Sequence, residues 1–443
     1  MTEVTNSKGA ENEKNCDQND AEANIEVAKV EEKEDNAPPD AFFTVHLLFF
    51  FLGLLHFIPT SFFNVATKYW MYKFRNTTEG AIDDAEHRTY MQKEFGVFST
   101  IFGSTPLVIF ITLTTIYGQH INARVRIVWT IFSMLVVFSM STIFINVNTD
   151  TWQVGFFCLT MFFIFVKSAA NSILGVSLFE VLSKFPRKYL VWYLAGEGVA
   201  GPFNSALQLA SLAIGTTIHV SALIYFMCGV FVIAMSLILF LVAKYTALYK
   251  HYIGKSDTVP RRKILSWKES KVIVKKIWSS ILINIVMISG LQIISPAVTT
   301  LIVSEDKGTP WADTYYLPFT YLLRDIADFI GRTLASKLKW NMNVYLVAAL
   351  SVVRLGVLIP LYLLSNAQPR SRLPVLLTHD YQYCILVLTY GISGGYLFNI
   401  AYLNIKRLVS EKEVNDGYNV LSTVIGIVGA VSSGFSYISV NML

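Results

Sequence analysis

The chain has 443 residues, of which 53% are hydrophobic, 14% aromatic and 15% charged, and its mean hydropathy is +0.48. These values exclude an ordinary soluble enzyme of two or three domains and predict an all-α membrane protein with many spans. The formal net charge of +5 combines an acidic start with a basic remainder. The basic residues are expected in loops at the membrane surface, so no nucleic-acid partner is predicted.

Residues 1–41 hold twelve acidic residues and four lysines, with no aromatic side chain. Such a segment cannot bury enough apolar surface to offset its chain entropy, so we predict a disordered acidic cytoplasmic tail. The first apolar run starts too late and is too long to be a cleavable signal.

Apolar runs long enough to cross a bilayer follow one another from residue 42 onward. We predict eleven transmembrane helices, at 42–70, 95–117, 125–147, 152–181, 189–214, 219–248, 277–303, 315–338, 343–365, 379–404 and 418–442. The basic loop 249–276 separates an N-terminal six-helix bundle, 42–248, from a C-terminal five-helix bundle, 277–443. Its Lys, Arg and Trp residues favour a segment lying along the inner leaflet, and the alternative is a solvated linker that continues into the next span.

The connecting loops differ in basic charge from one side of the membrane to the other. One set carries nineteen Lys and Arg residues and the other seven. The positive-inside rule makes the richer set cytoplasmic, which predicts a cytoplasmic N-terminus and an extracellular Leu443. The single sequon, Asn76-Thr77-Thr78, falls in the first outer loop, so Asn76 is a predicted glycosylation site. We find no acidic dileucine sorting motif and expect a monomer in the plasma membrane.

Catalytic and cofactor motifs do not stand out in this chain. Three of the four cysteines, Cys158, Cys228 and Cys384, are expected to be small buried hydrophobic residues, and Cys16 lies in the tail. No metal-ligand spacing, phosphate-binding glycine loop or nucleophile elbow is evident. We therefore expect no cofactor and no enzyme.

The stretch Tyr315–Lys339 is apolar but carries four charged residues at positions that a membrane would bury. On a helix, Tyr321, Asp325, Asp328 and Arg332 fall on one side, and the opposite side is left to Leu322, Phe329, Ile330 and Leu334. Charges inside a bilayer usually face a bundle interior or a wet cavity and mark a substrate path. The alternative is a structural ladder of ion pairs, Arg324 to Asp328 and Asp328 to Arg332, each four residues apart.

Other ionisable residues lie at similar depth in neighbouring spans: Lys167, Glu197, Arg354 and His56. We expect the charges to neutralise one another around a central cavity, with the spans 152–181, 189–214, 315–338 and 343–365 meeting there. Lys167 and Arg354 are expected to be partners of the acids, and His56 to be either a packing histidine or a proton sensor. The small residues around Gly196, Gly198 and Gly201 are expected to allow close helix packing.

The segment Asp328-Phe329-Ile330-Gly331-Arg332 resembles the D-x-x-G-R signature of the equilibrative nucleoside transporters. Six further stretches resemble the family in the same order: FIPTSFFNVATKYW, SLFE, AGEGVAG, SPAVT, VVRLGVLIP and GGYLFNIAYL. The resemblance implies a major-facilitator-like fold in which two helical bundles rock about a central site. It also implies that Asp328 and Arg332 hold the ribose hydroxyls, that Arg332 orients Asp328, and that Tyr321 lines the pocket beside the base. Phe57, Asn64 and Ser177 lie in the matching stretches and are further candidates for substrate binding.

The sequence departs from the family pattern at several of these positions. The glutamine that reads the nucleobase edge aligns with Gly175, an asparagine aligns with Asp325, and the glutamine of a G-Q-G turn aligns with Glu197. An acid at the Glu197 position resembles the monoamine-transporting branch of the family. The sequence therefore predicts a facilitative carrier of nucleosides, with nucleobases as a second substrate class. The alternative is an organic-cation or proton-coupled carrier that uses Glu197 and Asp325. A receptor, a channel and an intramembrane enzyme are weaker alternatives.

Overall fold

The computed structural model describes residues 37–77, 89–215, 217–253, 267–295, 298–306, 308–338, 344–368, 372–411, 413–433 and 435–442. Over this part of the chain the regular structure is helical, apart from the isolated bridges Ile302–Ala367 and Ser365–Leu377. The all-α prediction is confirmed for these residues. Most of the predicted tail and the middle of the basic loop lie outside them.

The helices follow the order of the predicted apolar runs. The first part of the chain contains η1 (Ala41–Phe43), α2 (Thr44–Val65), α3 (Thr67–Lys73), α4 (Tyr90–Tyr117), η2 (Gly118–His120), α5 (Ala123–Asn146), α6 (Gln153–Leu182), α7 (Arg187–Ile214), α8 (Ile218–Ala243) and α9 (Ala247–Ile253). The second part contains α10 (Trp267–Lys276), α11 (Trp278–Ile294), η3 (Thr299–Leu301), η4 (Trp311–Tyr315), α12 (Tyr316–Lys337), α13 (Val344–Leu363), α14 (Asp380–Leu408), α15 (Val414–Ser433) and α16 (Phe435–Met442).

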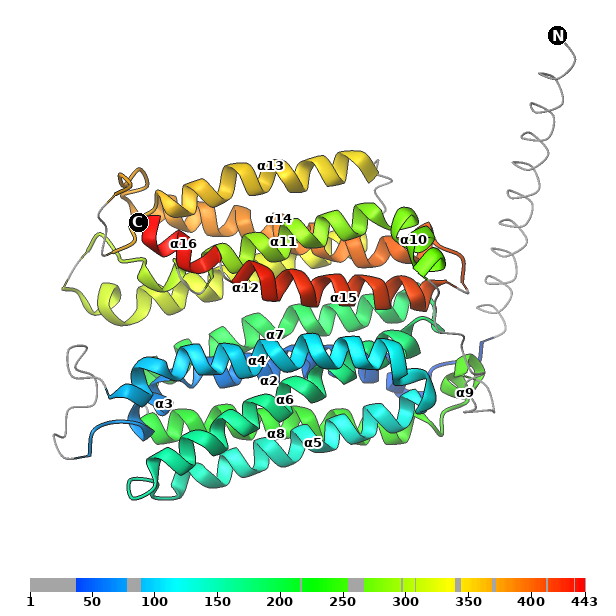
Figure 1. The fold of residues 1–443 in the computed structure, drawn as a ribbon, viewed down its shortest axis with the longest axis horizontal. Coiled ribbons are helices and arrows are strands. Elements are labelled where there is room, and N and C mark those ends of the chain that lie inside the picture. The colour runs from blue at the N-terminus through cyan, green and yellow to red at the C-terminus, as the bar shows by residue number, and fades with distance from the viewer. Residues whose placement is uncertain are drawn as a thin grey trace, which may run out of the picture.

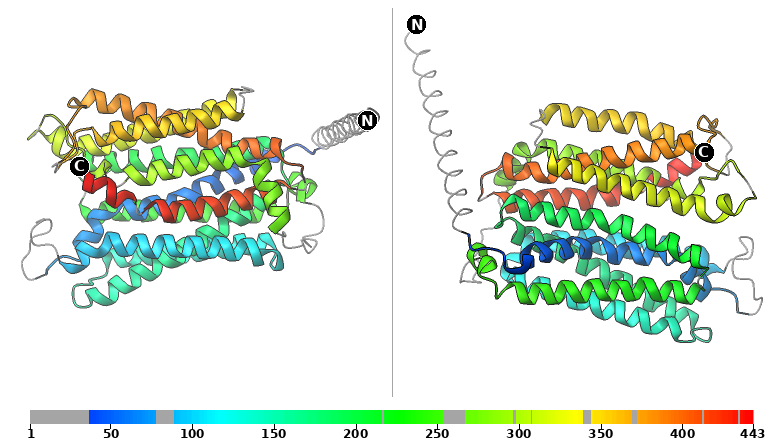
Figure 2. Two further views of the ribbon diagram at one scale, coloured as in Figure 1. Left: turned by 45° about the horizontal axis from the view of Figure 1, so that its top comes forward. Right: turned by 180° about the vertical axis from the view of Figure 1, so that it is seen from behind.

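The long helices run roughly side by side and form two groups, α2–α8 and α10–α16 (Figure 1). The groups meet along α7 and α12, and again where α15 packs against α4 and α6. We call the contact between α7 and α12 the seam. The short helices α9 and α10 mark one end of the molecule, and α3 and α16 mark the other (Figures 1 and 2). We call these the α10 end and the α3 end.

Six helices of the described chain are long and apolar enough to cross a membrane by length and composition, and a seventh span is possible if the bent pair α10 and α11 counts as one. Polar residues lower the hydropathy of others, such as α12, which carries the charged stripe. The chain is therefore a multi-pass membrane protein, and the count of eleven spans stays a prediction. The helix α10 is bent by 76° from α11, so the two do not form one straight helix, and the position of the basic loop along the inner leaflet stays a prediction.

Glycines bring α2 and α7 into close contact. A Cβ added at Gly196 would lie 2.0 Å from the carbonyl oxygen of Phe50, and one at Gly53 would lie 2.1 Å from that of Tyr193. No side chain fits at either position without moving the helices apart. The packing role predicted for Gly196 is confirmed.

Glycines also bring α12 and α14 into close contact. A Cβ at Gly331 would lie 2.1 Å from the carbonyl oxygen of Ile392, and one at Gly395 would lie 2.0 Å from that of Asp328. In a membrane, helices associate through packing and not through the hydrophobic effect, so this approach fixes the helix that carries the charged stripe.

Aromatic side chains from both groups pack together toward the α10 end. The ring of Phe179 on α6 stacks on Tyr402 of α14 at 5.3 Å and lies 4.9 Å from the ring of Tyr418 on α15. All three rings are buried. The Lys406 ammonium on α14 donates to the carbonyl of Leu182 at 3.0 Å, where a cation stabilises the carboxyl end of α6.

An ion pair at the same end ties α10 to the turn before α15. The Lys276 ammonium lies 2.8 Å from a Glu413 carboxylate oxygen, and this hydrogen bond lowers the pKa of the Glu413 carboxyl. Both side chains are partly exposed, so the pair contributes little to stability.

We expect Gly196→Ala to destabilise the protein by roughly 1–3 kcal/mol, because its Cβ would overlap the backbone of α2. Gly356→Ala on α13 is the matched control, since nothing lies within 4 Å of an added Cβ there. Thermal unfolding of both variants in the same detergent measures the difference. Equal melting temperatures would show that α2 and α7 do not depend on the glycine contact.

Candidate functional site

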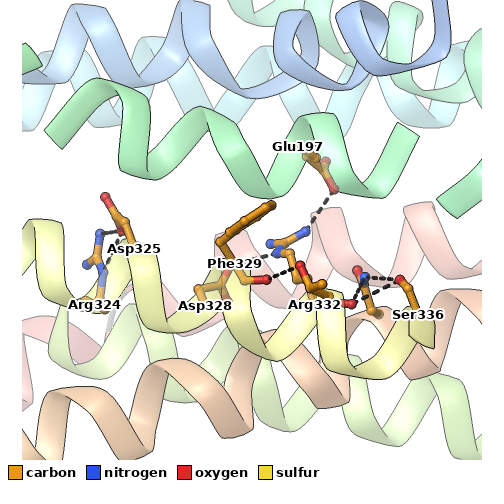
Figure 3. A network of polar contacts seen from close by, with 9 residues as sticks. Glu197, Arg324, Asp325, Asp328, Phe329, Arg332 and Ser336 are labelled. Atoms are coloured by element: carbon orange, nitrogen blue, oxygen red, sulfur yellow. Dashed lines mark hydrogen bonds and ion pairs between the residues drawn. The ribbon is translucent and has the colours of Figure 1, made fainter. Parts of the chain in front are cut away.

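The seam is formed by a small-residue face of α7 against the charged face of α12. Figure 3 shows the charged residues of α12 beside α7. A Cβ at Gly198 would lie 2.8 Å from Cδ of Arg332, and one at Gly201 would lie 3.1 Å from Cγ of Asp325. The missing side chains on α7 therefore leave the space that the arginine and the aspartate of α12 occupy.

The Arg332 guanidinium joins carboxylates from the two groups of helices. Its Nε donates to Oδ2 of Asp328 at 2.6 Å, one turn earlier on α12. Its Nη1 donates to Oε2 of Glu197 on α7 at 3.2 Å, as Figure 3 shows. The guanidinium carbon also lies 4.5 Å from the centre of the Phe398 ring on α14. Arginine suits this position because its fork of donors can bind two carboxylates at once.

The second oxygen of Glu197 extends the network to α2. His56 Nδ1 lies 2.9 Å from Oε1 of Glu197 and 2.9 Å from the hydroxyl of Tyr193, one turn earlier on α7. His56, Glu197, Arg332 and Asp328 thus form a continuous chain of polar contacts from α2 through α7 to α12. We call it the seam network.

Asp325 forms a separate polar contact nearer the α3 end. Its Oδ1 accepts from Nε and Nη2 of Arg324 at 3.1 and 2.9 Å. Its Oδ2 accepts from the Ser205 hydroxyl of α7 at 2.5 Å. Both oxygens are therefore engaged, one within α12 and one across the seam.

Asp328 is the most exposed acid of the seam network. Its side chain is 32% exposed, whereas those of Glu197 and Arg332 are each 12% exposed. Arg332 holds Oδ2, and Oδ1 has no hydrogen-bond partner among the described residues. The carboxylate is thus fixed by one oxygen and can accept hydrogen bonds from a ligand at the other.

Among the other predicted site residues, those whose side chains are described make no hydrogen bond or ion pair with the seam network. Tyr321 bonds with Thr299, and its ring centre lies 5.7 Å from the Arg324 guanidinium. Ser177 is fully buried, and its hydroxyl donates to the carbonyl of Ile173 within α6. Phe57 is 43% exposed on α2. The side chain of Asn64 lies outside the described part of the structure, so these assignments stay predictions.

Several predicted pairings are wrong. Lys167 has no acidic partner among the described residues and lies 5.1 Å from the centre of the Phe63 ring. Arg354 donates to the Ser393 hydroxyl and to the carbonyl of Tyr390. It cannot reach the acids because α13 packs against α11 and α14 and not along the seam. Lys167 and Arg354 therefore do not compensate the charges of α12.

Two details of the charged stripe also differ from prediction. Arg324 pairs with its neighbour Asp325 and not with Asp328, so only the second step of the predicted ladder exists. Phe329 does not lie on the lipid-facing side, because its ring would be 3.3 Å from a Cβ at Gly198 and points toward α7 (Figure 3). Phe329 is four residues after Asp325 and three before Arg332, so helix geometry itself puts it about 40° and about 60° from those residues, beside the charged stripe. The assignment to the opposite side is therefore wrong.

Sequence reasoning did not identify Tyr193 as a partner of His56 or Ser205 as a partner of Asp325. Tyr193 lies one turn before Glu197, and Ser205 follows Gly198 and Gly201 at helical spacing. That spacing places Gly198, Gly201 and Ser205 on one face of α7. It could have identified the face that meets α12.

Comparison with known proteins places most of this chain in one family. The family described as "Nucleoside transporter" matches residues 161–264 and 255–438. The matched residues include α7, α12 and the three members of the seam network that they carry.

Individual relatives are similar over nearly the full length. Equilibrative nucleoside transporter 1 of Rattus norvegicus is 25% identical over 433 residues, which is 87% of this chain and 94% of the relative. Equilibrative nucleoside transporter 2 of Homo sapiens is 24% identical over 450 residues, which is 91% of this chain and 98% of the relative.

Solved structures support the fold. The major facilitator superfamily transporter FucP, in its outward conformation, matches 89% of this chain with a TM-score of 0.52 and 11% identity, and 97% of its own chain is covered. A bacterial homologue of the human lysosomal transporter Spinster, in an inward-facing and unoccupied conformation, matches 88% of this chain with a TM-score of 0.51 and 15% identity, and 80% of its own chain is covered. The chain therefore has a major-facilitator-like helical fold.

We expect Arg332→Gln to lower stability by at most about 3–5 kcal/mol, because it leaves the largely buried Glu197 and the partly exposed Asp328 without their shared cation. Arg324→Gln is the matched control and should cost less, since Asp325 keeps the Ser205 hydroxyl. Thermal unfolding in detergent measures both losses.

The double variant Arg332→Gln, Glu197→Gln tests the cause of the loss. It should be more stable than Arg332→Gln alone, because it removes one of the two carboxylates that have lost the arginine. A double variant that is no more stable than the single variant would show that charge compensation is not what Arg332 contributes.

Proposed function

The chain belongs to the nucleoside transporter family, and from this we propose that it carries nucleosides across the membrane down their concentration gradient. Nucleobases are the second substrate class that we propose. It is a multi-pass membrane transporter and not an enzyme. The relatives named as equilibrative nucleoside transporters support a facilitative mechanism without a coupled energy source.

The proposal rests on the bonding, exposure and position of the Asp328 carboxylate. Its carboxylate is fixed at one oxygen by Arg332, is partly exposed, and lies in a seam between two groups of helices. Vicinal ribose hydroxyls donate hydrogen bonds, and a carboxylate oxygen accepts them. Remaining donors of the guanidinium can bind ring and hydroxyl oxygens of the same sugar.

The proposed mechanism is alternating access of two helical bundles about this seam. The aromatic rings of Phe179, Tyr402 and Tyr418 close the α10 end, so a substrate at Asp328 would enter and leave by the α3 end in this state. Breaking these contacts, with new contacts at the other end, would expose the site to the opposite side.

The topology completes the proposal. We place the eleven spans as a 6+5 arrangement, with bundles at 42–248 and 277–443. The α10 end carries the loops richer in Lys and Arg, so we place it in the cytoplasm, with the N-terminus inside, the C-terminus outside and the protein in the plasma membrane. We also propose that it functions as a monomer without a nucleic-acid partner.

The organic-cation or proton-coupled alternative requires a carboxylate that is free to bind an ammonium group or a proton. Glu197 is bonded to both Arg332 and His56, and Asp325 is bonded to both Arg324 and Ser205. Neither acid is unpaired, so the site favours the nucleoside carrier.

We expect Asp328→Ala to abolish uridine and adenosine uptake while the protein still reaches the cell surface, because the sugar loses its acceptor. Asp306→Ala, at an exposed aspartate of the loop before η4, is the matched control and should transport normally. Radiolabelled uptake, with nucleosides, nucleobases and an organic cation as competitors, makes the measurement. Uptake by Asp328→Ala at the wild-type rate would remove the site assignment.

We expect Asn76→Gln to remove an N-linked glycan, because the proposed topology puts the sequon outside the cell. The wild-type protein should shift in electrophoretic mobility after glycosidase treatment, and the variant should not. Thr78 lies outside the described residues, so this prediction depends on the sequence and the topology. A cytoplasmic signal from a tag placed near Asn76 would reverse the proposed orientation.

A further inference from the structure

His56 is a histidine in the middle of α2 that the proposed sugar site does not use. Its Nδ1 is engaged by Glu197 at 2.9 Å and by Tyr193 at 2.9 Å. Its Nε2 has no hydrogen-bond partner among the described residues, and its side chain is 25% exposed. One edge of the ring is therefore fixed, and the other carries an unused polar atom.

The partners of Nδ1 determine whether Nε2 donates or accepts a hydrogen bond. Glu197 is paired with Arg332, so its carboxylate is ionised and can only accept hydrogen bonds. Nδ1 must then carry the proton that lies between the ring and Glu197. In a neutral imidazole this leaves a lone pair on Nε2, which makes that atom a hydrogen-bond acceptor.

Gly175 on α6 keeps Nε2 uncovered. A Cβ added at Gly175 would lie 3.0 Å from Nε2 and 3.6 Å from Cε1 of His56. A side chain at this position would press on the ring and cover the atom. The glycine therefore preserves an acceptor on a rigidly held ring beside the seam.

We propose that His56 reads the nucleobase, with Nε2 accepting a hydrogen bond from a ring or exocyclic N–H of the base. The proposal rests on the nucleoside-carrier function and extends it. The seam network joins Asp328 to His56 through Arg332 and Glu197. In the proposed binding mode the sugar lies at Asp328 and the planar base points toward α2, where Nε2 of His56 is the acceptor. His56 is then a specificity residue that recognises a donor on the base edge.

The test compares uridine with N3-methyluridine, which lacks the N3–H donor but keeps the same sugar. The wild-type protein should prefer uridine by about 2- to 12-fold in KM, as expected for one lost hydrogen bond. In His56→Phe the ring remains but the acceptor is gone, so the ratio of the two KM values should approach one. A purely steric rejection of the methyl group would persist in this variant, because phenylalanine is no smaller.

His46→Phe is the matched control. His46 lies on the same helix and also pairs with a carboxylate, Asp40, at 2.6 Å, but it lies near the α10 end and away from the seam network. This variant should keep the wild-type ratio. A general disturbance of α2 would instead raise both KM values together and leave their ratio unchanged.

Gly175→Ala gives a second readout that keeps His56 in place. Its Cβ would cover Nε2, so this variant should also bring the ratio toward one. It decides the matter if His56→Phe fails to reach the cell surface. An unchanged ratio in the variants that do reach the surface overturns the inference.

The experiment distinguishes a failure of the carrier proposal from a failure of the proposed role of His56. If the wild-type protein takes up no nucleoside, the carrier proposal fails, and the role of His56 fails with it. If the wild-type protein transports uridine and N3-methyluridine with equal KM, the carrier proposal stands and the role of His56 is overturned.

Discussion

The structure depends on one buried guanidinium that is shared by carboxylates from both groups of helices. Moving such charges out of water costs several kcal/mol for each ion, and only close, well-oriented pairing offsets that cost. Arg332 meets the requirement by donating to Asp328 on its own helix and to Glu197 across the seam. The charges of α12 are therefore paired in this state partly within their own helix and partly through a contact that joins the two groups of helices.

Glycine spacing makes this contact possible, and it acts on both faces of α7. Gly196 lets α7 approach α2, while Gly198 and Gly201 leave room for the side chains of α12. Gly331 lets the backbone of α12 approach that of α14. The polar network is thus held by backbone contacts on either side, so its geometry is fixed before any substrate binds. Preorganised donors and acceptors lose less entropy on binding than mobile ones.

The sequence predicted the helical class, the charged stripe on α12 and the packing role of Gly196, because helical periodicity and the cost of buried charge are local properties. It did not predict which charges would meet. The sequence puts Arg354 near the middle of its span, as it does the acids, but position along a span does not fix which helices are neighbours, and α13 packs against α11 and α14. Lys167 was also mispredicted. Its long, flexible side chain places the ammonium over the Phe63 ring, where a cation–π contact takes the place of an acidic partner. The His56–Glu197 contact also depends on the register of α2 against α7, which the sequence pattern alone does not set.

The bonding of the seam network also explains how the two groups of helices can separate. If the seam opens, the Arg332–Glu197 bond and the Asp325–Ser205 bond are lost, since these cross from α7 to α12. Arg332 keeps Asp328 one turn away, Asp325 keeps Arg324, and Glu197 keeps His56 and the water that enters with the opening. Every ionised group that crosses the seam therefore retains a partner on its own side. If Glu197 were the only partner of Arg332, opening the seam would leave the arginine charge without a partner. The free-energy cost of that charge would oppose the separation of the two groups of helices.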